Sequence, residues 1–268
     1  MSLRGITISV NYGPLLAITL HRNMRHLTEC LVITSPDDEQ TQAVACSVPS
    51  VRLHVTDAFT RWGARFNKGL AFEEGFEALG RRGRLLIWDA DILLPENLDL
   101  SGWRAGCLHG ARRRLLEDPT AWSPDLDWRS LPHVRDGGPI GFFQAFDADD
   151  PAIAAKRPWY DVSFAHAGGG DAYFMTHWTN DRRRLLPIDV LHLGPNDRNW
   201  FGTDQAGRDI MSAFVIRNGW HRASRKADHS ALERIGEIPE RVEVPGYAPT
   251  GFELPFVRRT KAARAAGG

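Results

Sequence analysis

Two carboxylates follow a short apolar run in "RLLIWDADILLPENL", residues 84–98, where strand-favouring residues lead directly into Asp89 and Asp91. Residues two apart in an extended segment point to the same side, so the two carboxylates can converge on one hard cation. Mg²⁺ and Mn²⁺ prefer oxygen ligands and leave coordination positions for substrate phosphates. Such a cation would offset the charge of a diphosphate and make it a better leaving group. The pattern indicates a metal–diphosphate site, with two solvated loop acids as the simpler alternative.

Other uses of an Asp-x-Asp sequence fit this chain less well. In aspartyl-phosphate phosphatases the motif lies near the N-terminus and continues to Thr or Val, whereas Ile92 and Leu93 follow here. A P-loop nucleotidase would need G-x-x-x-x-G-K-[ST], which the sequence lacks. A nucleotidyltransferase of the pyrophosphorylase type would show a Gly-rich phosphate loop with a basic residue, which "NYGPLLA" does not supply. A non-catalytic protein that binds sugar nucleotides stays open as an alternative.

The elements that position these acids alternate between strand and helix. Strands are expected at 5–10, 29–35, 51–56 and 84–88, and helices at 14–27, 36–44 and 66–79. Strands separated by helices predict an α/β fold with a mostly parallel sheet and helices on both faces. In such folds ligands bind at the carboxyl ends of the strands, where Asp89 and Asp91 lie.

The second half of the chain is less regular. Residues 101–135 are rich in Trp and Arg and are expected to be irregular. Strands are expected at 139–147 and 185–194, a helix or loop at 149–159, a Gly loop entering a helix in "HAGGGDAYFMTHW" (166–178), and a helix at 204–220. No linker divides the chain, so we expect a single domain.

Composition gives no sign of a nucleic-acid or membrane partner. Lys plus Arg equals Asp plus Glu, at 33 each. The cysteines Cys30, Cys46 and Cys107 form no motif, which indicates a reducing compartment. No apolar run approaches the roughly 20 residues of a membrane span, and no signal-peptide pattern begins the sequence. We expect a cytoplasmic protein with no membrane span.

Three blocks carry a family resemblance: "RFNKGLAFEEGFEAL" with the following "LLIWDADILLPEN", then "HAGGGDAYFMTHW", then "VLHLGPNDRNWFG". Their order and spacing, over roughly residues 5–205, resemble the β-1,4-galactosyltransferase group of GT-A-fold glycosyltransferases. The last block is also similar to glycosyltransferases of phages and bacteria. The resemblance implies a GT-A (Rossmann-like) mixed, mostly parallel sheet. It also implies transfer of a hexose from a UDP-sugar donor to an acceptor hydroxyl, with Mn²⁺ or Mg²⁺. A saccharide or glycan is the expected acceptor, and a hydroxymethylated base of phage DNA is the alternative.

The resemblance also assigns roles around the metal. Asp91 is the expected main metal ligand, Asp89 would reach the metal or the ribose, and His192 would be a further ligand. Asp171 is the expected general base, which takes the proton of the acceptor hydroxyl and leads to inversion. The alternative for Asp171 is a helix N-cap, and the alternative for His192 is a bond to a backbone carbonyl.

Binding residues for the two substrates are expected on either side of the metal. Those for the nucleotide are Val10, Asn11, Tyr12, Asp37, Arg65, Asn67 and Lys68. Gly169 and Gly170 would let the acceptor approach the backbone closely, and Trp200 would contact the acceptor through its ring. The chain thus divides into a nucleotide-sugar-binding half (1–98), an acceptor-binding and catalytic half (99–225) and a partly flexible C-terminal extension (226–268).

Two positions depart from the family pattern. Gly170 stands where the group has a Glu, so a helper carboxylate is missing. The group's Met ligand has no counterpart, because Leu191 and Leu193 cannot bind a metal. The family's sugar preference therefore does not carry over to this chain.

Overall fold

A computed structural model describes residues 2–134, 138–194 and 241–252 of the chain. The strands are β1 (Leu3–Ile8), β2 (Glu29–Thr34), β3 (Val51–Val55), β4 (Arg84–Trp88), β5 (Ile92–Leu93), β6 (Leu108–Leu116), β7 (Phe143–Asp147) and β8 (Arg183–Leu193). The helices are α1 (Gly13–Asn23), α2 (Glu39–Cys46), α3 (Lys68–Leu79) and α4 (Gly170–Met175). The strands form one sheet in the order β3-β2-β1-β4-β7-β6-β8-β5.

The sheet is mixed, as predicted. Its first half is parallel, because β1 pairs with both β2 and β4, and β2 pairs with β3. In the second half β7 runs antiparallel to β4 and to β6, β6 runs parallel to β8, and the short β5 runs antiparallel to β8. The carboxyl ends of β1, β2 and β4 therefore meet at one edge of the sheet, where we expected the ligands.

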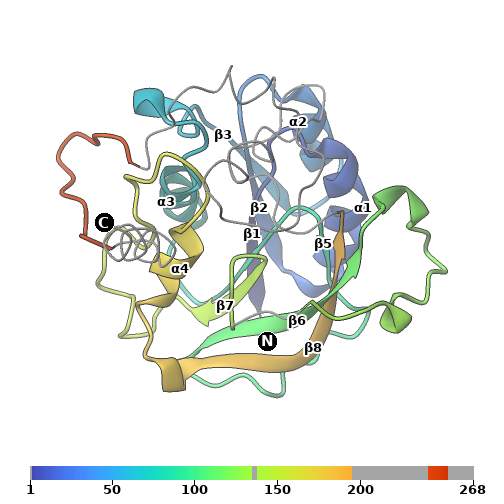
Figure 1. Ribbon diagram of the computed structural model, residues 1–268. Coiled ribbons are helices and arrows are strands. Elements are labelled where there is room, and N and C mark those ends of the chain that lie inside the picture. Colours follow the sequence, from blue (N-terminus) through green and yellow to red (C-terminus); the bar gives the residue numbers. More distant parts are fainter. Residues whose placement is uncertain (1, 135–137, 195–240, 253–268) are drawn as a thin grey trace, which may run out of the picture.

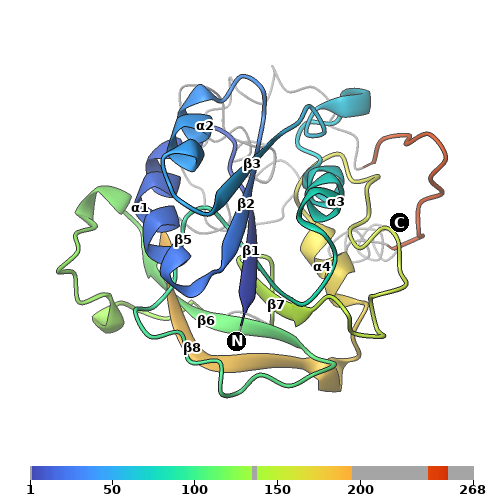
Figure 2. The same cartoon turned by 180° about the vertical axis from the view of Figure 1, so that it is seen from behind.

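Helices cover both faces of the sheet, which explains why its first strands read as continuous apolar runs. α1 and α2 lie on one side and α3 and α4 on the other (Figures 1 and 2). Along β4, Leu85 and Ile87 belong to the apolar core beneath α3, and Leu86 and Trp88 belong to the core beneath α1. Each face thus has its own core, and the chain beyond Trp88 emerges between them.

The expectation of irregular structure at 101–135 was wrong in part, because β6 lies inside this range. Its three consecutive arginines interrupt the apolar pattern on which the sequence reading depends. In the sheet Arg112 and Arg114 form ion pairs, at 3.1 and 3.0 Å from the carboxylate of Asp189 on β8, although Arg112 stays exposed to solvent. A strand can carry such charges when its neighbour supplies the partner.

Smaller differences concern element boundaries. β7 begins at Phe143, four residues later than expected. Residues 149–159 form turns, and the helix expected at 204–220 lies outside the described residues. Over the described ranges, no helix is long and apolar enough to cross a membrane.

Candidate active site

Helix α1 fixes the turn that carries the two aspartates. The Asn23 side chain, fully buried, donates to the carbonyl of Ile92 at 2.8 Å and accepts from the backbone N–H of Leu94 at 2.9 Å. The Thr19 hydroxyl donates to the carbonyl of Ala90 at 2.6 Å. These bonds satisfy backbone groups that would otherwise be buried without partners. The turn after β4 is therefore held on both sides of Asp91.

The pairing of β5 with β8 brings His192 to Asp91. Ile92 lies opposite His192, and the backbone N–H of Leu193 donates to the carbonyl of Asp91 at 2.9 Å. The Nε2 atom of His192 lies 3.3 Å from Oδ2 of Asp91. The other oxygen, Oδ1, is buried and has no hydrogen-bond partner among the residues that the structure describes. An unsatisfied buried carboxylate oxygen calls for a ligand from outside the protein.

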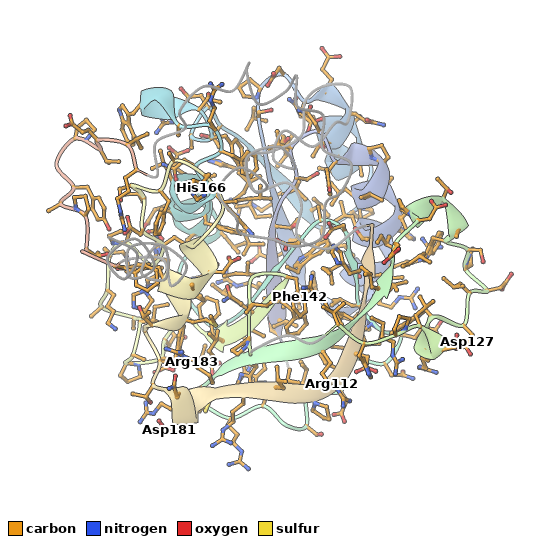
Figure 3. The ribbon with its side chains drawn as sticks, in the orientation of Figure 1. Arg112, Asp127, Phe142, His166, Asp181 and Arg183 are labelled. Carbon is orange, nitrogen blue, oxygen red and sulfur yellow. The ribbon has the colours of Figure 1, made fainter. Side chains whose placement is uncertain are left out.

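Arg113 of β6 lies on the far side of His192. Its Nη1 atom is 3.3 Å from Nδ1 of the imidazole, and its guanidinium stacks over the ring of Phe142 at 4.6 Å. Phe142 lies near the middle of the molecule (Figure 3). A guanidinium only donates hydrogen bonds, so Nδ1 accepts, and the proton of the neutral ring is assigned to Nε2, toward Asp91. A cation at this position would have to replace that proton.

Lys68, in the first turn of α3, connects Asp89 to Asp171. Its ammonium lies 3.0 Å from Oδ1 of Asp89 and 3.8 Å from Oδ1 of Asp171. Burial alone would lower the pKa of Lys68, but the Asp171 and Asp89 carboxylates outweigh it and the pKa is raised. Burial raises the pKa of Asp89, Lys68 opposes this, and Asp91 and Asp171 add to the increase. Three carboxylates thus surround one internal cation.

Asp171 lies in the first turn of α4, and its carboxylate packs against the backbone at Gly141, just before β7. A Cβ atom on Gly141 would lie 1.8 Å from Oδ2 of Asp171, so only glycine leaves room for the carboxylate. Gly169, with φ of 97°, occupies the N-cap of α4. The alternative reading of Asp171 as the cap is therefore wrong. A Cβ atom on Gly170 would lie 3.3 Å from the ring of Tyr160, in the place where the family has its Glu.

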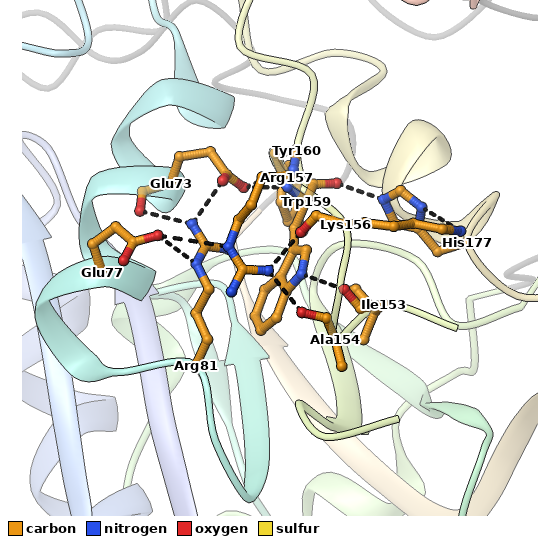
Figure 4. A network of polar contacts seen from close by, with 10 residues as sticks. All are labelled: Glu73, Glu77, Arg81, Ile153, Ala154, Lys156, Arg157, Trp159, Tyr160 and His177. Carbon is orange, nitrogen blue, oxygen red and sulfur yellow. Dashed lines mark hydrogen bonds and ion pairs between the residues drawn. The ribbon is translucent and has the colours of Figure 1, made fainter. Parts of the chain in front are cut away.

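A buried carboxylate on α3 holds the segment that supplies Tyr160. Glu73 accepts the backbone N–H groups of Trp159 and Tyr160, both at 2.8 Å, and pairs with Arg81 at 2.7 Å (Figure 4). Burial raises the pKa of Glu73, and Arg81 opposes this. The Tyr160 hydroxyl then lies 3.5 Å from Oδ1 of Asp171. Nothing in the sequence near Tyr160 pointed to this role.

Asp37 was predicted to contact the nucleotide near the loop after β1, but its neighbour Asp38 is the acid that contacts this loop. Asp38 accepts from the backbone N–H of Asn11 at 2.6 Å, the hydroxyl of Thr34 at 3.0 Å and the N–H of Thr41 at 3.0 Å. These bonds hold Asn11 in a left-handed conformation, with φ of 57°. Asp37 is exposed at the same edge, and its nucleotide contact stays a prediction. Val10 and Tyr12 are half-buried on either side of Asn11.

The three residues predicted at the start of α3 have different surroundings. Asn67 is the N-cap of the helix: it accepts from Leu70 N–H at 2.8 Å and donates to the carbonyl of Val162 at 2.7 Å. Asn67 was predicted to contact the nucleotide. Its amide is instead fully buried and hydrogen-bonded through both its oxygen and its nitrogen. Arg65 is exposed and keeps its predicted role, while Trp200 lies outside the described residues.

The residues present fit a divalent cation. In octahedral coordination at about 2.1 Å, neighbouring ligands lie about 3 Å apart, and Asp91 Oδ2 and His192 Nε2 are 3.3 Å apart. Within the described part of the chain no group of three or more His, Cys, Asp or Glu side chains forms a metal site. The protein would therefore supply a corner of the coordination sphere and leave the other positions to diphosphate oxygens and water.

No protein-family model matches the chain, and no curated protein matches its sequence. Among solved structures, glucosyl-3-phosphoglycerate synthase from Mycobacterium tuberculosis overlaps with a TM-score of 0.46 at 13% identity, over 72% of each chain. The inositol-1-phosphate CTP transferase from T. maritima overlaps with a TM-score of 0.41 at 10% identity, over 73% of this chain and 91% of that one. Mannosyl-3-phosphoglycerate synthase from Rubrobacter xylanophilus gives 0.35 at 16% identity, over 56% of this chain and 54% of its own, about half its length. The likeness is one of fold.

Proposed function

We propose that the chain is a metal-dependent glycosyltransferase that moves a hexose from a UDP-sugar to an acceptor hydroxyl with inversion. The observation that carries the proposal is the pairing of Lys68 with Asp89 and Asp171, next to an Asp91 whose Oδ1 has no hydrogen-bond partner among the described residues. This cluster lies beyond the carboxyl end of β4, the edge at which α/β sheets bind ligands.

Each carboxylate has a distinct task in the proposed reaction. Asp91, with Asp89 and His192 beside it, would hold Mn²⁺ or Mg²⁺. When bound, the cation neutralises charge on the diphosphate leaving group. Asp171 takes the proton of the acceptor hydroxyl as that oxygen attacks the anomeric carbon. Lys68 lies between Asp89 and Asp171 and offsets the repulsion between their carboxylates.

The two substrates would approach from opposite sides of Lys68. The donor nucleotide would lie over the loop at Val10–Tyr12, with Asp37 and Arg65 as contacts. The acceptor would lie over Gly169 and Gly170, with Trp200 as a further contact. A saccharide hydroxyl is the proposed acceptor, and a hydroxymethylated DNA base is the second acceptor to be screened.

The first experiment is a panel of UDP- and GDP-sugars incubated with Mn²⁺, Mg²⁺ or EDTA. We expect metal-dependent release of nucleotide diphosphate from one UDP-sugar, reduced more than about 100-fold in Asp91→Ala. Glu96→Ala is the matched control, because Glu96 is an exposed carboxylate a few residues further on.

Two results would overturn the proposal. Pyrophosphate release from a nucleoside triphosphate and a sugar phosphate would assign a nucleotidyltransferase instead. Binding of nucleotide sugars without turnover in any metal would assign a non-catalytic binding protein. With the donor identified, acceptors would be screened as saccharides and as hydroxymethylcytosine DNA.

A further inference from the structure

The hydroxyl of Tyr160 has two oxygen neighbours and a single hydrogen to give. Oε1 of Gln144 lies 2.8 Å away, and Oδ1 of Asp171 lies 3.5 Å away. The amide of Gln144 cannot turn round, because its Nε2 donates to the carbonyl of Pro139 at 2.9 Å. The Tyr160 hydrogen therefore goes to Gln144, because the 2.8 Å contact is the stronger of the two, and the 3.5 Å contact to Asp171 is left with an oxygen lone pair.

The packing around Tyr160 keeps its hydroxyl directed toward Gln144. Its side chain is fully buried, and its ring packs between those of Phe72 and Phe174 at centroid distances of 4.9 and 4.8 Å. Its backbone N–H is bound by Glu73. Burial raises the pKa of Tyr160 well above its usual value, and the carboxylates of Asp171, Asp89 and Glu73 add to this. The phenol consequently keeps its hydrogen and presents an oxygen lone pair to Asp171.

A lone pair at this position favours one protonation state of Asp171. The carboxylate gains nothing from it, whereas the carboxylic acid can donate its O–H to Tyr160 Oη. We propose that Tyr160 and Gln144 are positioning residues for the general base. Gln144 takes the Tyr160 hydrogen, so the Tyr160 oxygen is ready to accept the proton that Asp171 acquires. The inference deepens the proposed function and rests on it.

The proton and electron pairs balance without a further reactant. The acceptor O–H bond breaks, and its electron pair forms the new bond to the anomeric carbon. The diphosphate leaves with the electron pair of the old bond. The proton binds to Asp171, and the resulting O–H donates a hydrogen bond to Tyr160 Oη. The Tyr160 hydroxyl keeps its own hydrogen, which it donates to Gln144. Lys68 contacts the Asp171 carboxylate before the reaction, and the Tyr160 oxygen accepts the O–H that Asp171 gains.

An interaction that appears only as the proton moves should change kcat and leave donor binding unchanged. Tyr160→Phe keeps the ring and its packing, and we expect about a 10-fold lower kcat for transfer at an unchanged donor KM. Gln144→Met removes the acceptor of the Tyr160 hydrogen, which then turns to Asp171 and stabilises the carboxylate. We expect a larger loss, about 50-fold.

The decisive test is whether the double variant transfers faster or slower than Gln144→Met alone. In Tyr160→Phe combined with Gln144→Met the misdirected hydrogen is absent, so this variant should be faster than Gln144→Met and return to the rate of Tyr160→Phe. Additive losses, or a wild-type rate in Gln144→Met, would overturn the inference. Thermal unfolding of all variants checks folding, and Tyr173→Phe, the same change at a tyrosine of α4, should keep the wild-type rate.

Failure of the inference is distinguishable from failure of the proposed function. If the wild-type protein turns over no nucleotide sugar, the proposed function fails. If it does, and Asp171→Asn loses transfer but the double variant is no faster than Gln144→Met, only the inference fails. A loss expressed as a raised donor KM with a lower Tm would assign Tyr160 a packing role and would also overturn the inference.

Discussion

The two ends of the candidate site differ in how fully their polar atoms are hydrogen-bonded. At one end, which we call the metal corner, Asp91 and His192 share a long contact and one Asp91 oxygen has no partner among the described residues. At the other, the base corner, Asp171 lies near Lys68 and Tyr160, and Gln144 bonds to Tyr160 and to the carbonyl of Pro139. The first corner would hold the proposed cation, and the second would take the proton of the proposed transfer.

Lys68 is the part that the two corners share. Its ammonium contacts Asp89 on one side and Asp171 on the other, and its side chain is only 10% exposed. A cation in this position reduces the repulsion among carboxylates that a divalent ion and a proton later relieve. Each prediction below separates the corners or tests the link between them.

The largest effect is expected from Lys68→Met, because it should weaken both corners at once. Without the ammonium the carboxylates repel each other, and we expect kcat/KM for transfer to fall by more than about 100-fold. The test compares steady-state transfer with metal-dependent nucleotide release, and Lys68→Arg is the charge-conserving control. If only transfer falls, Lys68 belongs to the base corner alone.

Gly141→Ala should damage the base corner and leave the metal corner intact. The new methyl group would meet the Asp171 carboxylate at 1.8 Å and displace it. A displacement of this size lowers transfer by about 100-fold, while metal-dependent hydrolysis of the donor should persist. Gly102→Ala, at a glycine that packs on Pro187 instead of Asp171, is the control. Equal losses in transfer and hydrolysis would contradict the separation.

Asn23→Ala is the corresponding change on the metal side. It leaves the carbonyl of Ile92 and the N–H of Leu94 buried without their partner. We expect the free energy of unfolding to fall by about 2 kcal/mol and the apparent metal affinity to fall about 10-fold. Urea unfolding and metal titration of nucleotide release measure the two quantities. Unchanged metal affinity in a destabilised protein would show that the turn keeps its shape without α1.

The smallest effect concerns His166, in the segment that leads to Asp171. Burial lowers its pKa from 6.5 to about 4, and its Nδ1 accepts from the N–H of Gly168 at 3.0 Å. The unfolded chain therefore binds a proton that the folded chain does not, so stability falls as pH falls below 6.5. From about pH 6.5 to about pH 5.5 the loss is about 1 kcal/mol. Chemical unfolding at both pH values should show this dependence in the wild type and a flatter one in His166→Asn.

Sequence reasoning was most successful where each strand has a core on both faces. The runs at 29–35 and 84–88 became β2 and β4 within a residue or so, because buried parallel strands are nearly continuous apolar runs. The alternating run at 51–56 became the partly exposed edge strand β3. The sequence-based prediction failed at β6. There Arg114 pairs with Asp189 and Arg113 contacts His192, both on the neighbouring β8. That pairing depends on a contact some 75 residues away in the chain, which periodicity cannot reveal.

The same limit applies to the candidate site. Asp89 and Asp91 were selected from their residue type and position after a strand, and Asp171 and His192 from the family resemblance. In the structure Lys68 contacts Asp89 and Asp171, and His192 contacts Asp91. Tyr160, Gln144, Gly141 and Asn23 were missed, because each acts through a contact with a distant segment. An aromatic ring, an amide and a glycine have many ordinary uses in a core, so their types alone give no signal.

The pairing of β5 with β8 has a consequence for how the protein is made. Asp91 leaves the ribosome well before Asp171 and His192, and among the described residues β8 is the last strand in chain order. The turn that carries Asp91 therefore waits for a partner strand synthesised about a hundred residues later. During that interval the nascent chain contains the first three parallel pairings of the sheet but lacks both the base and the histidine. A fragment released before β8 would lack His192, and we expect it to be unable to carry out the proposed transfer.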